Sequence, residues 1–283
     1  MISFAFFGSS RFSTIVLDEL NEAGILPQLI VTAPDRPKGR GLRVSGTPVK
    51  EWAEAKHIPV LSPESIRDEA CSAALSEKKW DIFVVASFGV ILPKEILDIP
   101  EKGVINVHPS RLPKWRGPSP IQTSIMEDDK DTGVSIMLLD EKMDHGPIIA
   151  NEQVPISDWP PRTEKLEETL AHHGGKLLAK IIPEWISSAI TSRPQNDASA
   201  TYSSTLKKED GLISLTDDPY KNFLKIQALS GRPGVYFFTE RNGRQIRVKV
   251  TDAIFENGAM ILKKIIPEGK PEMSYDSFVN GAR

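Results

Sequence analysis

Short apolar segments alternate with amphipathic segments over the first 155 residues, and this alternation restricts the fold more than any other feature of the chain. Residues 81–87 contain five consecutive apolar residues, 82–86, without polar alternation, as expected for a central parallel strand buried on both faces. Strands that alternate with helices form a parallel sheet covered by helices on both sides, so the sequence predicts an α/β domain. Further strands are predicted at 2–7, 28–33, 59–61, 104–108, 132–139 and 147–156, and helices at 49–56, 66–76 and 163–190.

A polar segment without periodicity lies at 191–203 and predicts a linker between two domains. We therefore expect a first domain at 1–190 and a second at 204–283. The second domain contains alternating apolar segments and two Asn-Gly pairs of the kind that form hairpin turns, at 242–243 and 257–258. This pattern predicts a small, mostly β domain that closes into a barrel.

Composition excludes several classes of protein. No segment approaches the roughly 20 consecutive apolar residues that span a bilayer, and the N-terminal residues lack the basic region of a secretory signal. The only cysteine, Cys71, excludes an intramolecular disulfide and any multi-thiolate metal site. We therefore expect a cytoplasmic protein without membrane contact, in which Cys71 is a small buried apolar side chain.

The net charge of −3 hides an asymmetry between the two parts of the chain. Residues 1–193 carry a net charge of −5 and residues 194–283 a net charge of +2. Within the first part, residues 36–50 contain five cations and no acid. Such a segment is typical of a solvated surface loop, but a Gly-rich loop without acids is also suited to phosphate contacts.

The segment 103–120 contains the residues best suited to chemistry. Asn106 and His108 are two apart on a predicted strand, so both side chains point to the same side at the carboxyl end where open α/β sheets bind ligands. An amide can donate to a developing oxyanion, and an imidazole can act as acid or base near neutral pH. Asp144, in a later turn, could orient and stabilise a protonated His108. Taken alone, the pattern favours the interpretation that these residues are satisfied polar groups of a strand and a turn.

The order of the motifs resembles the 10-formyltetrahydrofolate-dependent formyltransferases. Within that family the likeness is greatest to the members that act on initiator methionyl-tRNA, and it covers almost the whole chain. The motifs are Phe7-Gly8-Ser9, the basic segment 35–41, residues 84–93, Asn106-x-His108-x-Ser110-x-Leu112-Pro113-x-x-Arg116-Gly117, residues 131–137, Asp144-x-Gly146-Pro147-Ile148 and Ala200-Thr201-Tyr202.

The resemblance implies a Rossmann-like formyltransferase domain followed by an OB-like barrel that binds tRNA. It implies 10-formyltetrahydrofolate as cosubstrate, no metal, and Asn106, His108 and Asp144 as catalytic residues. Arg111 departs from the family, in which Leu is more usual, and adds a charge near the predicted folate site. The folate-binding residues implied by the resemblance are Ala86, Ser87, Phe88, Gly89, Leu92, Ser110, Arg111, Leu112 and Pro113.

The resemblance also implies initiator methionyl-tRNA as the second partner of a monomeric enzyme. The cations expected to contact it are Arg36, Lys38, Arg40, Arg43, Lys207, Lys208, Arg241, Arg244, Arg247 and Lys249. One alternative is a formyltransferase acting on an amino-sugar nucleotide or another small amine. A further alternative is a noncatalytic RNA-binding or folate-binding protein.

Overall fold

The computed structural model describes residues 2–38, 43–241 and 243–281, which form two compact units. The first unit comprises residues 1–118, 131–154 and 167–202. The second comprises residues 119–130, 155–166 and 203–283. Residues 119–130 and 155–166 were predicted to belong to the first domain, but they group with the C-terminal residues. A helix within 119–130 packs against a helix near residue 220, which accounts for the first of these segments.

A seven-stranded sheet organises the first unit, in the order β5-β2-β1-β6-β7-β8-β9. The first five strands in this order are parallel, and β8 and β9 complete the sheet in antiparallel pairing. The strands are β1 (Phe4–Phe7), β2 (Leu29–Val31), β5 (Val60–Leu61), β6 (Ile82–Val85), β7 (Val104–His108), β8 (Gly133–Leu138) and β9 (Ile148–Gln153). A separate hairpin consists of β3 (Arg36–Lys38) and β4 (Arg43–Ser45).

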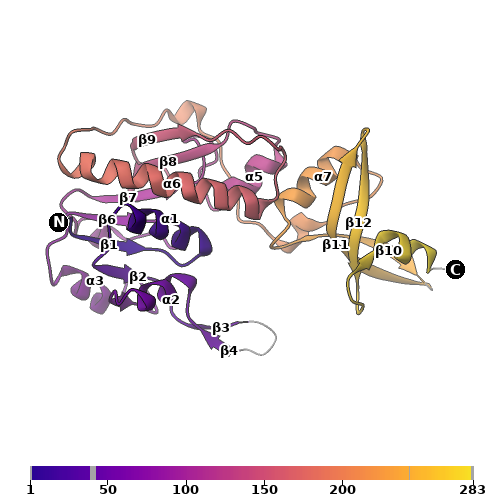
Figure 1. The fold of residues 1–283 in the computed structure, drawn as a ribbon, viewed down its shortest axis with the longest axis horizontal. Helices are drawn as coiled ribbons and strands as arrows, with labels where there is room; N and C mark the ends of the chain where they lie inside the picture. Colours follow the sequence, from indigo (N-terminus) through magenta and orange to yellow (C-terminus); the bar gives the residue numbers. More distant parts are fainter. Residues whose placement is uncertain (1, 39–42, 242, 282–283) are drawn as a thin grey trace. The chain divides into compact units, whose positions relative to one another are not determined.

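Helices connect the parallel strands, as Figure 1 shows. They are α1 (Arg11–Glu22), α2 (Pro48–Ala55), α3 (Glu69–Ser76) and α4 (Lys94–Leu97). The long α6 (Thr163–Ile186) follows β9, the last strand of the sheet. The sequence specifies where two of them begin. Ser10 caps α1 by accepting a hydrogen bond from the Ser13 amide, and Thr47 caps α2, which has Pro48 at its first position.

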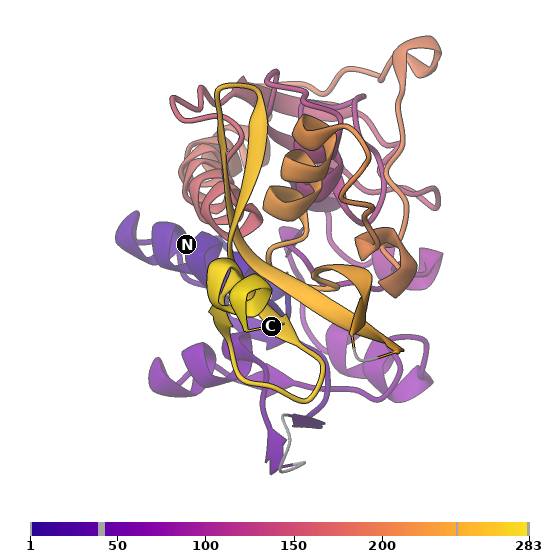
Figure 2. The same cartoon turned by 90° about the vertical axis from the view of Figure 1, so that its right-hand side faces the viewer.

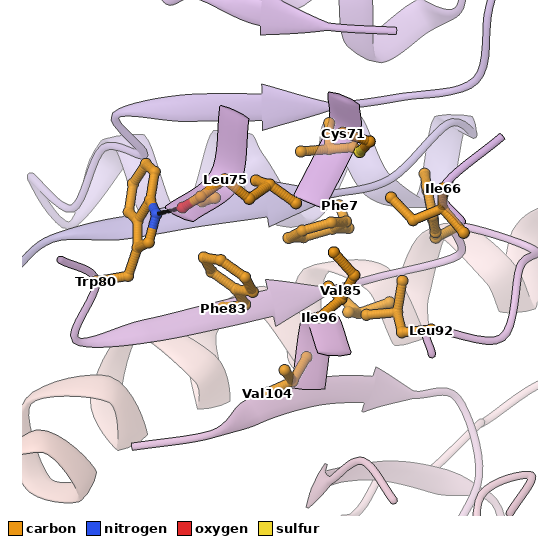
Figure 3. Close-up of a cluster of buried hydrophobic side chains, with 13 residues drawn as sticks. Phe7, Ile66, Cys71, Leu75, Trp80, Phe83, Val85, Leu92, Ile96 and Val104 are labelled. Atoms are coloured by element: carbon orange, nitrogen blue, oxygen red, sulfur yellow. Dashed lines mark hydrogen bonds between the residues drawn. The ribbon is translucent and has the colours of Figure 1, made fainter. Parts of the chain in front are cut away.

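The core on one face of this sheet is rich in aromatic side chains (Figure 3). Phe7, from β1, packs against Phe83 and Phe88 with ring centroids 5.1 and 5.6 Å apart. Trp80 closes one end and donates from its indole to the Leu75 carbonyl. Cys71 lies in this cluster, 2% exposed, and burial raises the pKa of its thiol, as expected for a buried apolar side chain.

The second unit is built on a four-stranded antiparallel sheet in the order β10-β11-β12-β13 (Figure 2). Its strands are β10 (Val235–Arg241), β11 (Arg244–Glu256), β12 (Ala259–Pro267) and β13 (Met273–Ser274). The helical segments are α5 (Pro120–Met126), α7 (Pro219–Ala228), α8 (Tyr275–Asn280) and the short η2 (Lys208–Gly211). Helix α7 packs on β11 and β12, and α8 packs on β12 and β13.

The predicted fold class is confirmed, because a Rossmann-like sheet with helices is followed by a C-terminal antiparallel sheet. The described strand pairs of that sheet run in linear order, and register shifts near Asp252 bend the long β11. Across residues 2–38, 43–241 and 243–281, no helix has the length and apolar character needed to cross a membrane.

Candidate active site

Strand β7 ends at the centre of the candidate site. Asn106 and His108 lie on the same side of this strand, and each is paired across the sheet with a residue of β8, Met137 and Ser135 respectively. The two side chains are 9% and 4% exposed. Within the part of the chain that the structure describes, the Asn106 side chain has no hydrogen-bond partner, and its amide atoms are not sealed from solvent. Its donor and acceptor are therefore available to a bound molecule.

The structure brings Asp144 to His108, as the sequence hypothesis required. The Asp144 Oδ1 atom lies 3.7 Å from the His108 Nδ1 atom. The other carboxylate oxygen accepts a hydrogen bond of 2.7 Å from the Gly117 amide. The opposite nitrogen of the ring, Nε2, lies 3.1 Å from the Trp115 carbonyl oxygen. Both ring nitrogens therefore lie near protein oxygens, and Nε2 is within hydrogen-bond distance of one of them.

The loop after β7 is held by a buried serine and an asparagine on the neighbouring antiparallel strands. The Ser135 hydroxyl donates to the Ser110 carbonyl at 2.7 Å and accepts from the Leu112 amide at 3.0 Å. Asn151 donates to both the Leu112 carbonyl and the Ser135 hydroxyl. The sequence analysis did not identify Ser135 or Asn151, although both alternate into the sheet face that carries this loop. The predicted folate-binding residues Ser110 and Leu112 are 2% and 4% exposed, and Pro113 follows them.

Arg111 points toward other protein groups. Its guanidinium forms an ion pair with Asp131 and donates from Nε to the Asn151 amide oxygen. Asp131 also pairs with Lys114 at 3.5 Å. The charge that distinguishes this loop from the family pattern is thus balanced within the first unit, and a role of Arg111 in folate binding stays a prediction.

The segment that follows β6 contains the other predicted folate-binding residues. Strands β1 and β6 are neighbours from which the chain continues in opposite directions across the sheet, and ligands bind at such a switch point. Ala86 is buried, and its carbonyl accepts from the Ser13 hydroxyl at 2.6 Å. Ser87 and Gly89 both have positive φ angles, of 49° and 80°, and nothing lies within 4 Å of the position of a Cβ at Gly89. Phe88 and Leu92, by contrast, belong to the aromatic core.

The predicted cations of the first unit lie on the β3–β4 hairpin. Arg36 forms an exposed ion pair of 2.8 Å with Glu64. Lys38 and Arg43 are register partners in the backbone pairing of β3 with β4. Arg40 lies outside the described residues. The hairpin itself follows β2, so its chain leaves the carboxyl edge of the sheet.

The predicted cations of the second unit interleave with aromatic side chains on the β10–β11 hairpin. Lys249 is paired with Tyr236 and Arg247 with Phe238 across the strands, which places all four side chains on one face. Phe238 is 47% exposed, and the Arg247 guanidinium lies 5.5 Å from the centre of the Tyr236 ring. The remaining predicted cations are Arg241, which lies 4.7 Å over the ring of Phe278, Arg244 at the hairpin turn, and the exposed Lys207 and Lys208.

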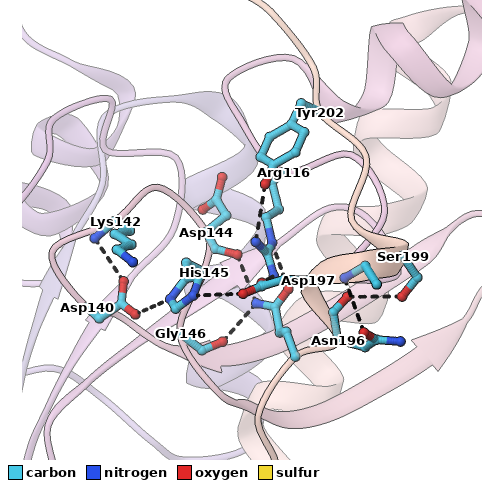
Figure 4. A network of polar contacts seen from close by, with 12 residues as sticks. Arg116, Asp140, Lys142, Asp144, His145, Gly146, Asn196, Asp197, Ser199 and Tyr202 are labelled. Carbon is cyan, nitrogen blue, oxygen red and sulfur yellow. Dashed lines mark hydrogen bonds and ion pairs between the residues drawn. The ribbon is translucent and has the colours of Figure 1, made fainter.

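The segment predicted as a linker is hydrogen-bonded to the first unit through residues 193–202 (Figure 4). Arg193 pairs with Ile148 at the start of β9, and Thr201 accepts from the Trp115 amide through its hydroxyl. Arg116, which is 2% exposed, forms a 2.7 Å hydrogen bond with Asp197. This hydrogen bond lowers the pKa of Asp197 below its ordinary value. The polar side chains of the segment make these contacts, and the same polar, aperiodic composition is typical of a linker.

No group of three or more His, Cys, Asp or Glu side chains suited to a metal ion occurs among the described residues. The arrangement at β7 instead combines an amide donor, an imidazole and a carboxylate at the carboxyl end of a sheet. This combination can stabilise an oxyanion and transfer a proton.

Comparison with known proteins agrees with this chemistry. The family described as formyl transferase matches residues 2–182. A protein of Syntrophus aciditrophicus strain SB named methionyl-tRNA formyltransferase is 36% identical, with alignment over 99% of this chain and 96% of its own length. The fold resembles the solved methionyl-tRNA formyltransferase from Clostridium thermocellum, with a TM-score of 0.61, 17% identity and coverage of 94% of this chain and 99% of that one.

A solved N-formyltransferase from Helicobacter canadensis, in complex with folinic acid and dTDP-3-aminofucose, has the same fold. Its TM-score is 0.67 at 19% identity, with coverage of 91% of this chain and 89% of that one. The chain belongs to the formyl transferase family, whose members carry out one-carbon transfer. Within that family it belongs with the methionyl-tRNA formyltransferases, to which its full-length sequence similarity extends.

Proposed function

We propose that the chain transfers the formyl group of 10-formyltetrahydrofolate to the α-amino group of methionine on initiator methionyl-tRNA, acting as a cytoplasmic monomer in translation initiation. The observation that carries this proposal is the Asn106 amide without a protein partner among the described residues, beside the His108–Asp144 pair. The amide atoms are not sealed from solvent, so a bound substrate can reach them and accept a hydrogen bond.

The residues divide the work of the transfer. The cosubstrate supplies an activated formyl carbon, which the amine of the acceptor attacks. Asn106 donates a hydrogen bond to the oxygen that becomes negative during this attack, and the positive charge of protonated His108 stabilises the same oxygen. Asp144 orients His108 and balances its positive charge. The imidazolium gives its proton to the nitrogen that departs, and the neutral imidazole then takes the proton that the attacking amine must lose.

Two segments are suited to hold the folate. The open space beside Gly89 and the exposed Ser87 lie at the end of β6, next to the strand that carries Asn106. The loop at 109–113 follows the same strand and is fixed by Ser135 and Asn151. The proposed transfer requires no metal, because side chains supply the groups that stabilise the oxyanion.

The amine acceptor distinguishes this function from that of a sugar formyltransferase. We expect formyl transfer from 10-formyltetrahydrofolate to charged initiator tRNA and negligible transfer to an amino-sugar nucleotide at the same concentration. A cosubstrate with a labelled formyl group allows formylated tRNA and formylated sugar nucleotide to be measured in the same way. Transfer to the small amine alone would refute the tRNA assignment, and tRNA binding without transfer to either acceptor would favour a noncatalytic binding protein.

The basic hairpin provides a second prediction. We expect Arg40→Ala to raise the KM for tRNA roughly tenfold while the KM for the folate changes less than twofold, because a phosphate contact contributes to one substrate alone. Loss of one contact should also reduce the salt dependence of tRNA binding by a slope of about 1. Lys176→Ala, at an exposed cation on α6, is the matched control. Equal effects on both KM values would exclude this role for the hairpin.

A further inference from the structure

Gln195 joins two loops that the catalytic proposal depends on. Its amide nitrogen, Nε2, donates to the backbone carbonyls of Asp144 and Gly146, at 2.8 Å in each case. Its amide oxygen, Oε1, accepts a 2.9 Å hydrogen bond from the Arg116 guanidinium. Every polar atom of this side chain is therefore used, and each end contacts a different loop.

The Arg116 side of this contact is firmly anchored. The buried guanidinium also reaches Asp197 and, at 3.5 Å, the Tyr202 hydroxyl (Figure 4). The Arg116 amide donates to the Thr201 carbonyl at 2.9 Å. A buried cation with several fixed acceptors resists displacement, because moving it would leave a charge without partners. Gln195 therefore links the Asp144 loop to a rigid support.

The Asp144 loop needs such a support. Asp144 has a φ angle of 49°, a left-handed conformation that costs a non-glycine residue free energy and persists when surrounding contacts enforce it. Its carboxylate is held to the Gly117 amide on one side and faces His108 at 3.7 Å on the other. The two bonds from Gln195 hold the carbonyl of Asp144 itself and that of the second residue beyond it. The backbone at Asp144 is thereby fixed from the side opposite its carboxylate.

We infer that Gln195 is a positioning residue for formyl transfer, which holds the Asp144 loop against Arg116 so that the Asp144 carboxylate stays directed at His108. The inference rests on the proposed roles of Asp144 and His108. The residue acts through Asp144 and touches neither substrate. Its removal should impair the chemical step and leave the binding of both substrates intact.

Two substitutions separate the two ends of the side chain. Gln195→Ala removes all three hydrogen bonds, whereas Gln195→Glu keeps an acceptor for Arg116 and loses both donors to the carbonyls. We expect each variant to lower kcat by about 10- to 100-fold, with both KM values within twofold of those of the unsubstituted protein. Ser199→Ala is the matched control, because this exposed hydroxyl of the same segment bonds only within its own turn.

A double-mutant cycle with Asp144→Ala distinguishes positioning from a general structural role. If Gln195 acts through Asp144, then Gln195→Ala should cause no further loss of kcat in the Asp144→Ala background. A multiplicative loss in that background, a change confined to KM, or wild-type kcat in Gln195→Glu would each overturn the inference. Wild-type kcat in Asp144→Ala alone would instead refute the proposed role of Asp144, so the two failures can be told apart.

Discussion

Replacement of His108 by Ala is expected to lower kcat for formyl transfer by about three orders of magnitude, since an acid or base in position contributes roughly 10²- to 10⁴-fold. In the described part of the candidate site, the His108 imidazole lies between the Asp144 carboxylate and the Trp115 carbonyl, and the proposal assigns the proton transfer to it. Asn106→Ala should cost about 10²- to 10³-fold in kcat, the usual effect of removing one oxyanion donor. Single-turnover assays with charged tRNA would measure both losses.

The control for this prediction is His57→Asn. His57 is exposed and has a φ angle of 56°, which asparagine tolerates, so this substitution removes an imidazole without strain. Equilibrium binding of tRNA to His108→Ala should stay within about threefold of that of the unsubstituted chain. If His108→Ala retained more than a tenth of the original kcat, His108 would not be the proton donor of the reaction. A loss of binding in parallel with turnover would indicate that His108 has a structural role.

Periodicity predicted those elements whose burial is uniform. The apolar segment at 81–87 contains strand β6, whose four residues are all buried, and residues 104–108 form β7. The same pattern placed Asn106 and His108 on one side of a strand, because alternation follows from strand geometry alone. Pairing direction could not be predicted in this way, since β8 and β9 join the sheet antiparallel and an apolar segment has the same composition in either direction.

Sequence patterns did not predict the residues that hold the loops of the site in place. Arg116 and Gln195 are 79 residues apart, and their bond depends on the course of the chain between them. Arginine is rarely buried completely, so nothing in its neighbourhood predicted that Arg116 would be 2% exposed. The segment at 191–203 has the polar composition of a linker, but its polar groups satisfy buried partners in the first unit. The same reasoning missed Ser135, a hydroxyl in an otherwise apolar strand.

Stability should respond most strongly at the glycines where backbone segments approach closely. A Cβ at Gly146 would lie 2.0 Å from the Leu138 carbonyl oxygen, an atom of strand β8 that cannot rotate away. We expect Gly146→Ala to lower the free energy of unfolding of the first unit by about 3 kcal/mol, the upper end of the usual cost of overpacking. For a unit of this size, this loss corresponds to a fall of roughly 6–12 °C in Tm, which calorimetry would resolve.

Gly133→Ala separates the loss of stability from the loss of activity. A Cβ there would lie 2.0 Å from the Glu152 carbonyl oxygen, the same approach to a backbone oxygen, and 2.8 Å from the Arg111 side chain. Gly133 lies at the start of β8 and does not adjoin Asp144. Both variants should be destabilised, and Gly146→Ala should also lose kcat at temperatures where it is folded, because its carbonyl receives a bond from Gln195. Gly46→Ala is the control, since its Cβ would meet side-chain atoms and no backbone: Lys50 at 3.2 Å and the Asp35 carboxylate at 3.6 Å. Equal Tm values for Gly46→Ala and Gly146→Ala would contradict the close approach at Leu138. Equal losses of kcat in Gly133→Ala and Gly146→Ala would contradict a specific role of the Asp144 loop in catalysis.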